Sequence, residues 1–316
     1  MRIGIDAMGG DFAPSVVVEG AVMASKEVDD NFKIVLFGDE QRINEEFKRF
    51  PGSYNNIEIV HTSQVIEMAD SPAHAFSQKP DSSIVVGFSH LKSGKIDAFA
   101  SAGSTGAMMA GCMLVSRQIE GIMRPAIATV LKTTRGGEVM ILDIGLNVDS
   151  KPEVLGQYGL IGSIYCSEVL GIENPRIALL NIGEEPEKGN SQSKATYAVM
   201  AEQADKYNFV GNVEAKYIFT GDKADVFVCD GYVGNTILKL CEGIFSCINE
   251  SLHCETIVDS FNYEAEGGTP VLGVNNNVVI GHGCSSAIAI KNMLLQAQRG
   301  AKSSLVSTLK QAFAQK

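Results

Sequence analysis

The sequence predicts an α/β fold with a largely parallel sheet that helices cover on both faces. Short segments rich in Val and Ile alternate with helical patterns along almost the whole chain, and this alternation is typical of parallel sheets buried between helices. Two consecutive strand patterns are instead joined by a short turn, Thr134–Gly137. That turn indicates a hairpin, so we expect a mixed, mostly parallel sheet.

The elements of the first half follow one another with few interruptions. Residues 2–6 (RIGID) alternate as a strand, and Pro14 stands where the first turn of the next helix begins. Further strands are predicted at 32–38, 57–62 and 96–103, with helices over 39–50 and 82–94.

The second half adds apolar strands, most of them separated by helices of ten or more residues. These strands are predicted at 125–131, 138–145, 176–183, 224–231 and 276–283. No linker, low-complexity tract or obvious repeat is visible. We therefore expect one compact unit or two interlocked subdomains.

Composition narrows the class of protein. The 316 residues are 45% hydrophobic, which is enough for a substantial core. The net charge of -11 argues against a general nucleic-acid binder, since phosphate neutralisation needs clustered Lys and Arg. No signal-peptide pattern precedes the first strand, and no apolar run reaches the ~20 residues of a membrane span. These features predict a cytoplasmic protein.

The cysteines and histidines do not predict a metal site. Seven cysteines, an odd number, indicate reduced thiols. Cys241, Cys247 and the pair His253-Cys254 match no zinc spacing. Cys241 and Cys247 fall within an apolar helical stripe, so we expect both to be buried.

Candidate binding residues follow the predicted strands. Ligands of open α/β sheets bind beyond the carboxyl ends of the strands. Six strands here end in glycine, small polar residues and a helix start, and glycine lets backbone amides approach a ligand closely. The candidates are Asp6, Gly9, Gly10, Asp11, Gly103, Ser104, Thr105, Gly106, Asn147, Asp149, Asn181, Gly183, Glu184, Glu185, Lys188, Asp230, Gly231, Gly234, Asn235, His282, Gly283, Ser285 and Ser286.

Two of these junctions, Gly103–Gly106 and Gly283–Ser286, place Ser or Thr at a predicted helix N-terminus. The free N–H groups and the helix dipole favour an anion there. The alternative is that Ser104 and Ser285 only cap their helices. The sequence has neither a G-x-x-x-x-G-K-[ST] loop nor a G-x-S-x-G elbow, which argues against a nucleotide site of that kind and a serine hydrolase.

Taken in order, several motifs resemble one family. "GIDAMGGDFAP", "ASAGSTGA", "RPAIA", "LDIGLNVD", "LLNIGEEPEKGN", "CDGYVGNTILK" and "GHGCSSA" occur in the order seen in the PlsX-type phosphate acyltransferases of bacterial phospholipid synthesis, over almost the whole chain. The resemblance implies a three-layer αβα fold like that of phosphotransacetylases and isocitrate/isopropylmalate dehydrogenases. It also implies two interlocked subdomains, about 1–120 with 270–316, and 121–269.

The resemblance also implies an activity. Family members move a long-chain acyl group from acyl carrier protein to inorganic phosphate without a cofactor. The acyl phosphate then serves a membrane-bound glycerol-3-phosphate acyltransferase. Family members look like homodimers that work at the membrane surface. A phosphotransacetylase acting on acyl-CoA is the main alternative; an NAD-dependent decarboxylating dehydrogenase and a non-catalytic scaffold fit the motifs less well.

The chemistry of this reaction fits the residues. Phosphate is substantially dianionic at neutral pH, and the leaving thiol has a pKa of about 8.5, so little acid–base help is needed. Positioning and charge stabilisation remain, and we expect direct attack with no acyl-enzyme. Lys188 is the expected charged contact to phosphate; the alternative is an ion pair with a neighbouring Glu. We expect His282, Asn235 and Asp230 to complete the catalytic set.

Some positions depart from the family pattern. Ser104 stands where Asn is usual, and Lys79 lacks the preceding Arg. Glu242–Gly267 is shorter than the family's membrane-linked segment, and its stripe of Ile244, Phe245, Ile248 and Leu252 favours a core or dimer-facing helix over membrane contact. Two basic sets are candidates for docking an acidic carrier protein, although dipole compensation at helix ends is an alternative for the second. They are Arg117, Arg124, Lys132 and Arg135, and Lys291, Arg299, Lys302, Lys310 and Lys316.

Overall fold

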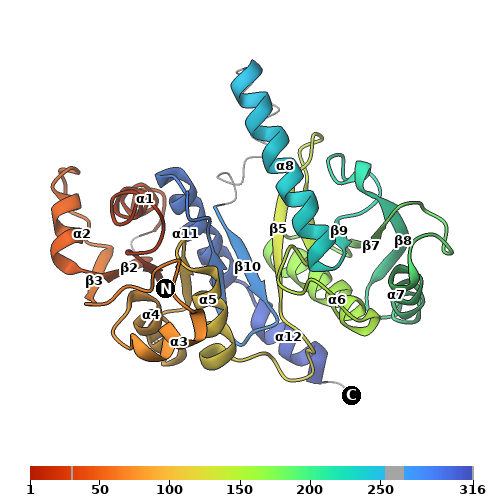
Figure 1. The fold of residues 1–316 in the computed structure, drawn as a ribbon, viewed down its shortest axis with the longest axis horizontal. Helices are drawn as coiled ribbons and strands as arrows, with labels where there is room; N and C mark the ends of the chain where they lie inside the picture. The colour runs from red at the N-terminus through yellow and green to blue at the C-terminus, as the bar shows by residue number, and fades with distance from the viewer. Residues whose placement is uncertain (30, 253–266, 315–316) are drawn as a thin grey trace. The chain divides into compact units, whose positions relative to one another are not determined.

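The computed structural model describes residues 1–29, 31–252 and 267–314. The chain groups into two compact units (Figure 1). The first contains the described residues of Met1–Gln118 and Tyr263–Lys302, and the second those of Ile119–Asn262 and Ser303–Lys316. The predicted division placed 303–316 in the first unit. The described part of that segment belongs to the second, because α12 (Leu305–Ala314) packs on α6 (Pro152–Val169).

The first unit is built on a sheet with the strand order β3-β2-β1-β4-β11-β10. The strands are β1 (Arg2–Asp6), β2 (Lys33–Gly38), β3 (Ile57–His61), β4 (Ala98–Ser101), β10 (Thr269–Leu272) and β11 (Asn277–Ile280). All neighbours pair in parallel except β10 and β11, which form an antiparallel pair. The carboxyl ends of β1, β4 and β11 therefore meet at one edge of the sheet.

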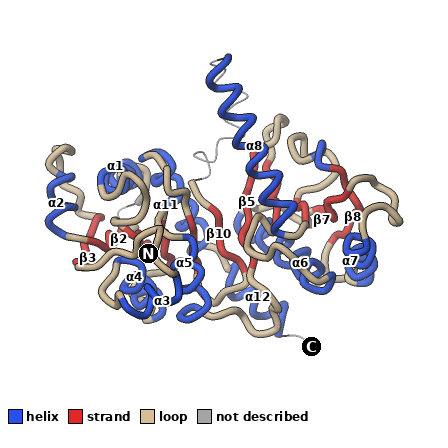
Figure 2. Tube along the Cα trace, in the orientation of Figure 1, coloured by secondary structure: helices blue, strands red, loops and turns tan. Residues whose placement is uncertain are grey.

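Helices flank this sheet (Figure 2). They are α1 (Ser15–Ser25), α2 (Glu40–Phe47), α3 (Pro72–Gln78), α4 (Ser83–Lys92), α5 (Thr105–Gly111) with a π-helical turn at Cys112–Ser116, and α11 (Ala287–Lys302). Helices α1 and α11 pack closely: a Cβ on Gly20 would lie 2.6 Å from the Ile290 side chain. Asp39 begins α2, its side chain accepting from the N–H groups of Gln41 and Arg42.

The second unit has the strand order β5-β6-β9-β7-β8. Its strands are β5 (Ala126–Lys132), β6 (Glu138–Leu142), β7 (Arg176–Asn181), β8 (Asn208–Glu214) and β9 (Val226–Val228). Besides α6 and α12, its helices include α7 (Ser191–Glu202) and α8 (Gly231–Leu252). Strands β5 and β6 pair antiparallel, with Lys132 opposite Glu138, which confirms the predicted hairpin. The other pairs are parallel.

These sheets confirm the predicted fold class, a mixed and mostly parallel α/β architecture. The structure also contains elements that the sequence did not predict, among them α3, β8 and β10. Strand β8 contains Gly211 at a positive φ, where the register of its pairing with β7 shifts. Strand β10 has only four residues. Neither therefore shows the regular alternation by which strands are recognised.

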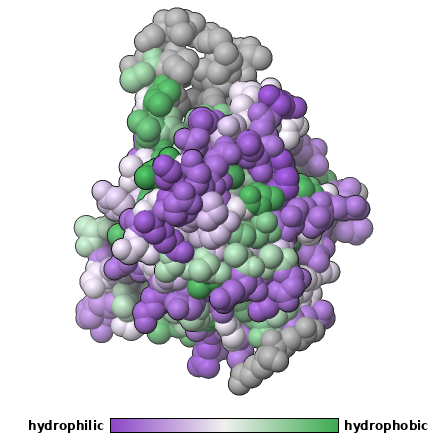
Figure 3. Space-filling view, turned by 90° about the vertical axis from the view of Figure 1, so that its right-hand side faces the viewer, coloured by the Kyte–Doolittle hydropathy of each residue, from purple (hydrophilic) through white to green (hydrophobic). Residues whose placement is uncertain are grey.

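Helix α8 exposes apolar side chains on its surface. No helix in the described ranges is both long and apolar enough to cross a bilayer. On α8, however, the side chains of Leu240 and Ile244 are 62% and 49% exposed, and Figure 3 shows apolar atoms gathered beside the grey atoms at the top of the view. Ile244 is therefore not a core residue of this chain. The side chains of Phe245, Ile248 and Leu252, and the residues His253 and Cys254, lie outside the described part.

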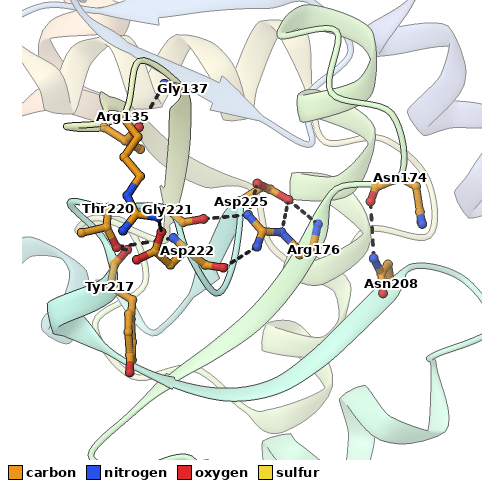
Figure 4. A network of polar contacts seen from close by, with 11 residues as sticks. Arg135, Gly137, Asn174, Arg176, Asn208, Tyr217, Thr220, Gly221, Asp222 and Asp225 are labelled. Atoms are coloured by element: carbon orange, nitrogen blue, oxygen red, sulfur yellow. Dashed lines mark hydrogen bonds and ion pairs between the residues drawn. The ribbon is translucent and has the colours of Figure 1, made fainter.

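An arginine and an aspartate join the amino ends of two strands in each unit. In the second unit, the Arg176 N–H donates to Asp225 Oδ2 at 2.7 Å, and the Asp225 N–H donates back to the Arg176 carbonyl at 2.9 Å (Figure 4). In the first unit, the Arg2 N–H donates to Asp97 Oδ2 at 2.7 Å, and the Asp97 N–H returns a bond of 2.7 Å. The two strand pairs, β7–β9 and β1–β4, begin in the same way.

This correspondence reveals an internal repeat that the sequence analysis did not detect. Ile3 pairs with Ala98 as Ile177 pairs with Val226, so the two strand pairs share one register. The order β2-β1-β4-β11-β10 of the first sheet matches β8-β7-β9-β6-β5 of the second, including the antiparallel pair at one end. In the sequence, 95–106 and 223–234 share the pattern K-x-D-x-F-x-x-x-G-x-x-G. Only five identical residues carry it, and chain order differs between the units, which hides the repeat.

Candidate functional site

Three glycine-containing loops meet beyond the carboxyl ends of β1, β4 and β11. The Asp11 N–H donates to the Gly283 carbonyl at 2.8 Å. A Cβ on Gly9 would lie 2.8 Å from the Gly103 nitrogen, and Gly10 has a φ of +105°. Glycine is required at both positions, because a side chain would separate the loops or strain the backbone. The structure thus brings together five predicted residues: Gly9, Gly10, Asp11, Gly103 and Gly283.

Asp6 lies beneath these loops. It is 1% exposed and accepts hydrogen bonds from Ser101 Oγ at 2.7 Å and the Met8 N–H at 3.0 Å. Burial raises the pKa of this carboxyl group above its ordinary value, and bonds from the Ser83 and Ser101 hydroxyls partly offset the rise. Asp6 is placed to hold the loops together from inside the unit.

The loop after β4 shows the capping arrangement. Ser104 is buried, and its hydroxyl accepts from the Ala107 N–H at 3.3 Å at the start of α5. Gly106 packs against Pro72, whose Cγ would lie 2.4 Å from an added Cβ. Thr105 is exposed. The N–H groups of the first helical turn have no intrahelical acceptor, so this end of α5 retains donors for a ligand.

The loop after β11 differs from the prediction in its cap. Ser286 Oγ, not Ser285 Oγ, accepts from the first turn of α11, from the Ala289 N–H at 3.3 Å. Ser285 is 2% exposed, and its hydroxyl has no hydrogen-bond partner in the described part of the chain. The Ser285 N–H donates to the carbonyl of His282, a half-buried residue, at 3.0 Å. The cap is displaced by one residue because the turn at 282–285 precedes the helix.

In the second unit, Asp143 organises the loop after β6. Its buried carboxylate accepts from the N–H groups of Gly145 at 3.3 Å, Leu146 at 3.2 Å and Asn147 at 2.6 Å. Sequence reasoning left Asp143 out of the candidate set; an acidic residue directly after an apolar strand and two residues before a glycine is the signal that marks it. Asp149 is exposed.

The Asn147 side chain faces the interior. Its Nδ2 lies 2.7 Å from the Pro125 carbonyl, 2.9 Å from Asp143 Oδ2 and 2.8 Å from the Tyr158 hydroxyl. Burial, with the Asp143 charge as a smaller cause, raises the pKa of the Tyr158 hydroxyl. Tyr158 therefore stays protonated, and Asn147 serves to fix the loop through its side chain.

The loop after β9 packs directly on this one. The Gly231 N–H donates to the Asn147 carbonyl at 2.8 Å, and a Cβ on Gly234 would lie 1.9 Å from the Asp143 carbonyl oxygen. Asn235 is exposed, and its side chain lies 3.5 Å from the position of a Cβ on Gly145. Asp230 begins α8, where its Oδ1 accepts from the Val233 N–H at 2.8 Å. The structure thus gathers Asn147, Asp230, Gly231, Gly234 and Asn235.

The loop after β7 holds the exposed charges. The Asn181 side chain accepts from the Ile182 N–H at 2.8 Å and donates to the Lys188 carbonyl at 3.2 Å. Glu184 pairs with Lys223 at 3.4 Å. Within the described residues, no carboxylate pairs with the ammonium group of Lys188, so the ion pair considered from the sequence is not formed. Gly183 lies in the same loop. A Cβ added at Gly183 would lie 3.0 Å from Glu185 Oε2.

The Cys229 thiol, next to the loop after β9, is not an activated thiolate. Burial, followed by the charges of Asp230 and Asp143, raises the pKa of the Cys229 thiol well above its ordinary value. Cys241 is buried as predicted, whereas Cys247, also predicted to be buried, is exposed. Across the described ranges, no three His, Cys, Asp or Glu side chains gather in a way that suits a metal ion.

These loops at the carboxyl ends of parallel strands define an α/β protein of the phosphotransacetylase fold. A phosphotransacetylase from Streptococcus pyogenes matches with a TM-score of 0.65 at 17% identity, over 95% of this chain and 94% of that one. The EutD phosphotransacetylase from Staphylococcus aureus matches with a TM-score of 0.64 at 15% identity, over the same shares. At these identities the likeness shows the fold alone.

The sequence relatives identify the family. The model of the fatty acid synthesis protein family matches residues 1–256. A phosphate acyltransferase from Halothermothrix orenii is 41% identical over 98% of both chains, and one from Dictyoglomus turgidum is 42% identical over 96% of this chain and 94% of its own. The chain belongs to this family. The predicted resemblance to the phosphate acyltransferases, and the prediction of an acyltransferase enzyme, are confirmed.

Proposed function

We propose that this protein transfers an acyl group from an acyl carrier protein to inorganic phosphate, giving an acyl phosphate for phospholipid synthesis. The observation that carries the proposal is the close approach of the backbones of the three loops at Gly9, Gly103 and Gly283 at one sheet edge. Such an arrangement suits a small anion. The names of the relatives, phosphate acyltransferase, support the same reaction.

The proposed reaction is one displacement. A phosphate oxygen attacks the thioester carbonyl carbon, the C–S bond breaks, and the carrier leaves as a thiolate. Phosphate already bears the charge that makes it a nucleophile, so the protein supplies position and charge stabilisation. In the first unit, we assign phosphate to the loop Gly103–Gly106 and oxyanion stabilisation to His282 and the amides of Gly283–Ser286, except the Ser285 N–H, which donates to the His282 carbonyl. In the second unit, Lys188 offers positive charge to an anionic substrate, and Asn235 offers an amide donor.

Direct attack requires no covalent acyl-enzyme. The buried thiol of Cys229, with its raised pKa, is unsuited to act as a nucleophile. We expect no acyl adduct on Cys284 or Ser285 either. Mass spectrometry of the protein quenched during turnover tests this point. An acyl adduct that forms and decays at the rate of turnover would replace direct attack with a two-step mechanism.

The central experiment measures release of free carrier protein from a long-chain acyl carrier substrate, with and without inorganic phosphate, and traps acyl phosphate with hydroxylamine. We expect release only with phosphate. Acyl-CoA is the parallel substrate, because preference for it would favour a phosphotransacetylase. Release that is independent of phosphate would overturn the proposal.

We also propose that the enzyme is a homodimer and that α8 contributes to the contact. Its exposed Leu240 and Ile244 lie four residues apart on one helical face. Light scattering of the wild type and of Leu240→Glu tests this: the wild type is expected to be a dimer and the variant a monomer. A dimeric variant would remove α8 from the interface. From the family resemblance, we further propose that the enzyme contacts a membrane surface and the membrane glycerol-3-phosphate acyltransferase.

The carrier protein is proposed to dock on exposed basic side chains. Of the two basic sets, Lys291 already pairs with Glu27 at 2.9 Å, and Arg135 pairs with Asp222. Lys302 and Lys310 are exposed. Charge reversal at Arg299 and Lys302 is expected to weaken carrier binding, measured by titration. Unchanged binding would exclude this surface.

A further inference from the structure

A hydrogen-bonded chain of three residues runs beneath the loops of the first unit. The Gly103 N–H donates to Ser101 Oγ at 2.9 Å, and Ser101 Oγ donates to Asp6 Oδ2 at 2.7 Å. Asp6 Oδ1 accepts from the Met8 N–H at 3.0 Å, at the start of the loop that carries Gly9. Ser101 and Asp6 are 0% and 1% exposed. This series of hydrogen bonds therefore links the loop after β1 to the loop after β4 from below.

We propose that Asp6 and Ser101 are a positioning pair, whose task is to hold the loops Gly9–Asp11 and Gly103–Gly106 in the arrangement that binds phosphate. The inference rests on the proposed function, because it assigns phosphate to these loops. Neither side chain touches the substrate. Ser101 is absent from the predicted site, and Asp6, predicted to contact phosphate, acts through the loops instead.

The second unit shows what the fold alone needs at the same two positions. The shared register of β1–β4 and β7–β9 matches Asp6 with Leu180 and Ser101 with Cys229. Leu180 and Cys229 both belong to the buried hydrophobic cluster of the second unit. An apolar pair thus satisfies this place in the sheet. The hydroxyl and carboxyl groups of the first unit are not required to form the strands.

The polar pair is unfavourable by itself. Burying a carboxyl group removes its hydration, and its raised pKa reflects that loss. Replacing a buried polar pair with apolar side chains of similar volume is often neutral or stabilising. Asp6 and Ser101 are not needed to form the strands, and they hydrogen-bond to both loops. Their presence is therefore best explained by a role in fixing the geometry of those loops.

The packing shows how the pair acts. A Cβ on Gly9 would lie 2.2 Å from Asp6 Oδ2, and a Cβ on Gly103 would lie 3.1 Å from both Asp6 Oδ2 and Ser101 Oγ. The backbone of both loops therefore rests on these two side chains. Without them, the Gly103 peptide loses its acceptor and is free to rotate. A displacement of about 1 Å in a reacting group is enough to lower a rate by roughly 100-fold.

The decisive variant copies the second unit into the first: Asp6→Leu with Ser101→Cys. Single variants Ser101→Ala and Ser101→Thr accompany it, and Ser116→Ala is the matched control. Ser116 is also a buried serine of the first unit, 5% exposed, and its hydroxyl has no partner in the described part of the chain. Measurements are circular dichroism and thermal unfolding, KM for phosphate and kcat, and calorimetric titration with inorganic phosphate.

We expect the double variant and Ser101→Ala to fold and to raise KM for phosphate at least tenfold, with weaker calorimetric binding. Ser101→Thr keeps the hydroxyl and is expected to recover most of the affinity, and Ser116→Ala to match the wild type. A folded double variant or Ser101→Ala with wild-type phosphate affinity would overturn the positioning role. If the wild type binds phosphate but transfers no acyl group, the proposed function fails, and the binding titration still decides the role of the pair.

Discussion

Arg176 and Asp225 are joined by both backbone and side-chain contacts at the amino ends of β7 and β9. The Arg176 Nε and Nη2 atoms donate to the two carboxylate oxygens of Asp225 at 3.0 and 2.8 Å, and Nη1 donates to the Asp222 carbonyl at 2.6 Å. Hydrogen bonding to Asp225 raises the pKa of the guanidinium group. The contact lies at the opposite ends of the strands from the candidate site, so its role is structural.

Substitution Arg176→Ala is therefore expected to lower stability without changing substrate affinity. Charge-assisted hydrogen bonds that are half-buried contribute about 1.5–3 kcal/mol, and urea unfolding measures the loss. Arg42→Ala is the control, since Arg42 is exposed on α2. Equal stability of the two variants would show that the backbone pairing alone holds these strands.

Two glycines of α8 offer a matched comparison. A Cβ on Gly234 would lie 1.9 Å from the Asp143 carbonyl oxygen, whereas one on Gly243 would meet nothing within 4 Å among the described residues. We expect Gly234→Ala to destabilise the protein by about 1–3 kcal/mol and to reduce activity, because overpacking shifts the loop after β6. Gly243→Ala is expected to stabilise by about 0.5–1 kcal/mol. Thermal unfolding compares them, and a tolerated Gly234→Ala would contradict the packing argument.

Lys188 tests the proposed binding of phosphate in solution. Its ammonium group is exposed and has no carboxylate partner among the described residues, so Lys188→Ala removes charge without breaking an ion pair. We expect a KM for phosphate raised roughly tenfold, the effect of about 1.4 kcal/mol, at unchanged melting temperature. Lys206→Ala, another exposed lysine of the second unit, should behave as wild type. Identical phosphate dependence in both variants would show that Lys188 does not contact phosphate.

The buried carboxyl group of Asp6 predicts a specific dependence of stability on pH. Its pKa is raised in the folded protein above the ordinary 3.8, so below 3.8 the group is protonated in both states and folding bears no penalty. Between pH 3.8 and the folded-state pKa, the unfolded chain binds fewer protons than the folded protein, so stability falls as pH rises. Asp6→Asn removes this term. The stability of Asp6→Asn relative to wild type should increase with pH above 3.8 and then level off in urea unfolding; a constant difference would contradict the burial argument.

The elements of the fold could be predicted from the sequence where the hydrophobic pattern of a segment agrees with its burial in the structure. The strands at 2–6, 33–38 and 176–181 are short apolar runs bounded by turns, and the hairpin at 126–142 carries its own glycine turn. Strand β8 was not accessible, because its Gly211 breaks the alternation and its pairing depends on β7. Local pattern cannot reveal a strand whose neighbours define it.

The candidate site was accessible in part for the same reason. Glycine and small polar residues after each strand identified Gly9, Gly103 and Gly231, because ligand loops and close backbone approach need the same residue type. Sequence reasoning could not separate residues that face a ligand from those that hold a loop. Asp143, which directly follows a predicted strand, and Ser101 were left out of the candidate set, because their partners, the amides of Asn147 and Gly103, are assigned only once the loops are folded.

The division of the chain between the units has a consequence for synthesis on the ribosome. Strand β4 takes β1 as one neighbour and β11, at 277–280, as the other. The strands of the second unit, from 126 to 228, are all made before β11. Until β11 is synthesised, one edge of β4 therefore has no strand to pair with. An unpaired strand edge can form hydrogen bonds with other chains. We expect the sheet of the second unit to be completed first, and the sheet of the first unit to be completed last, when β11 pairs with β4.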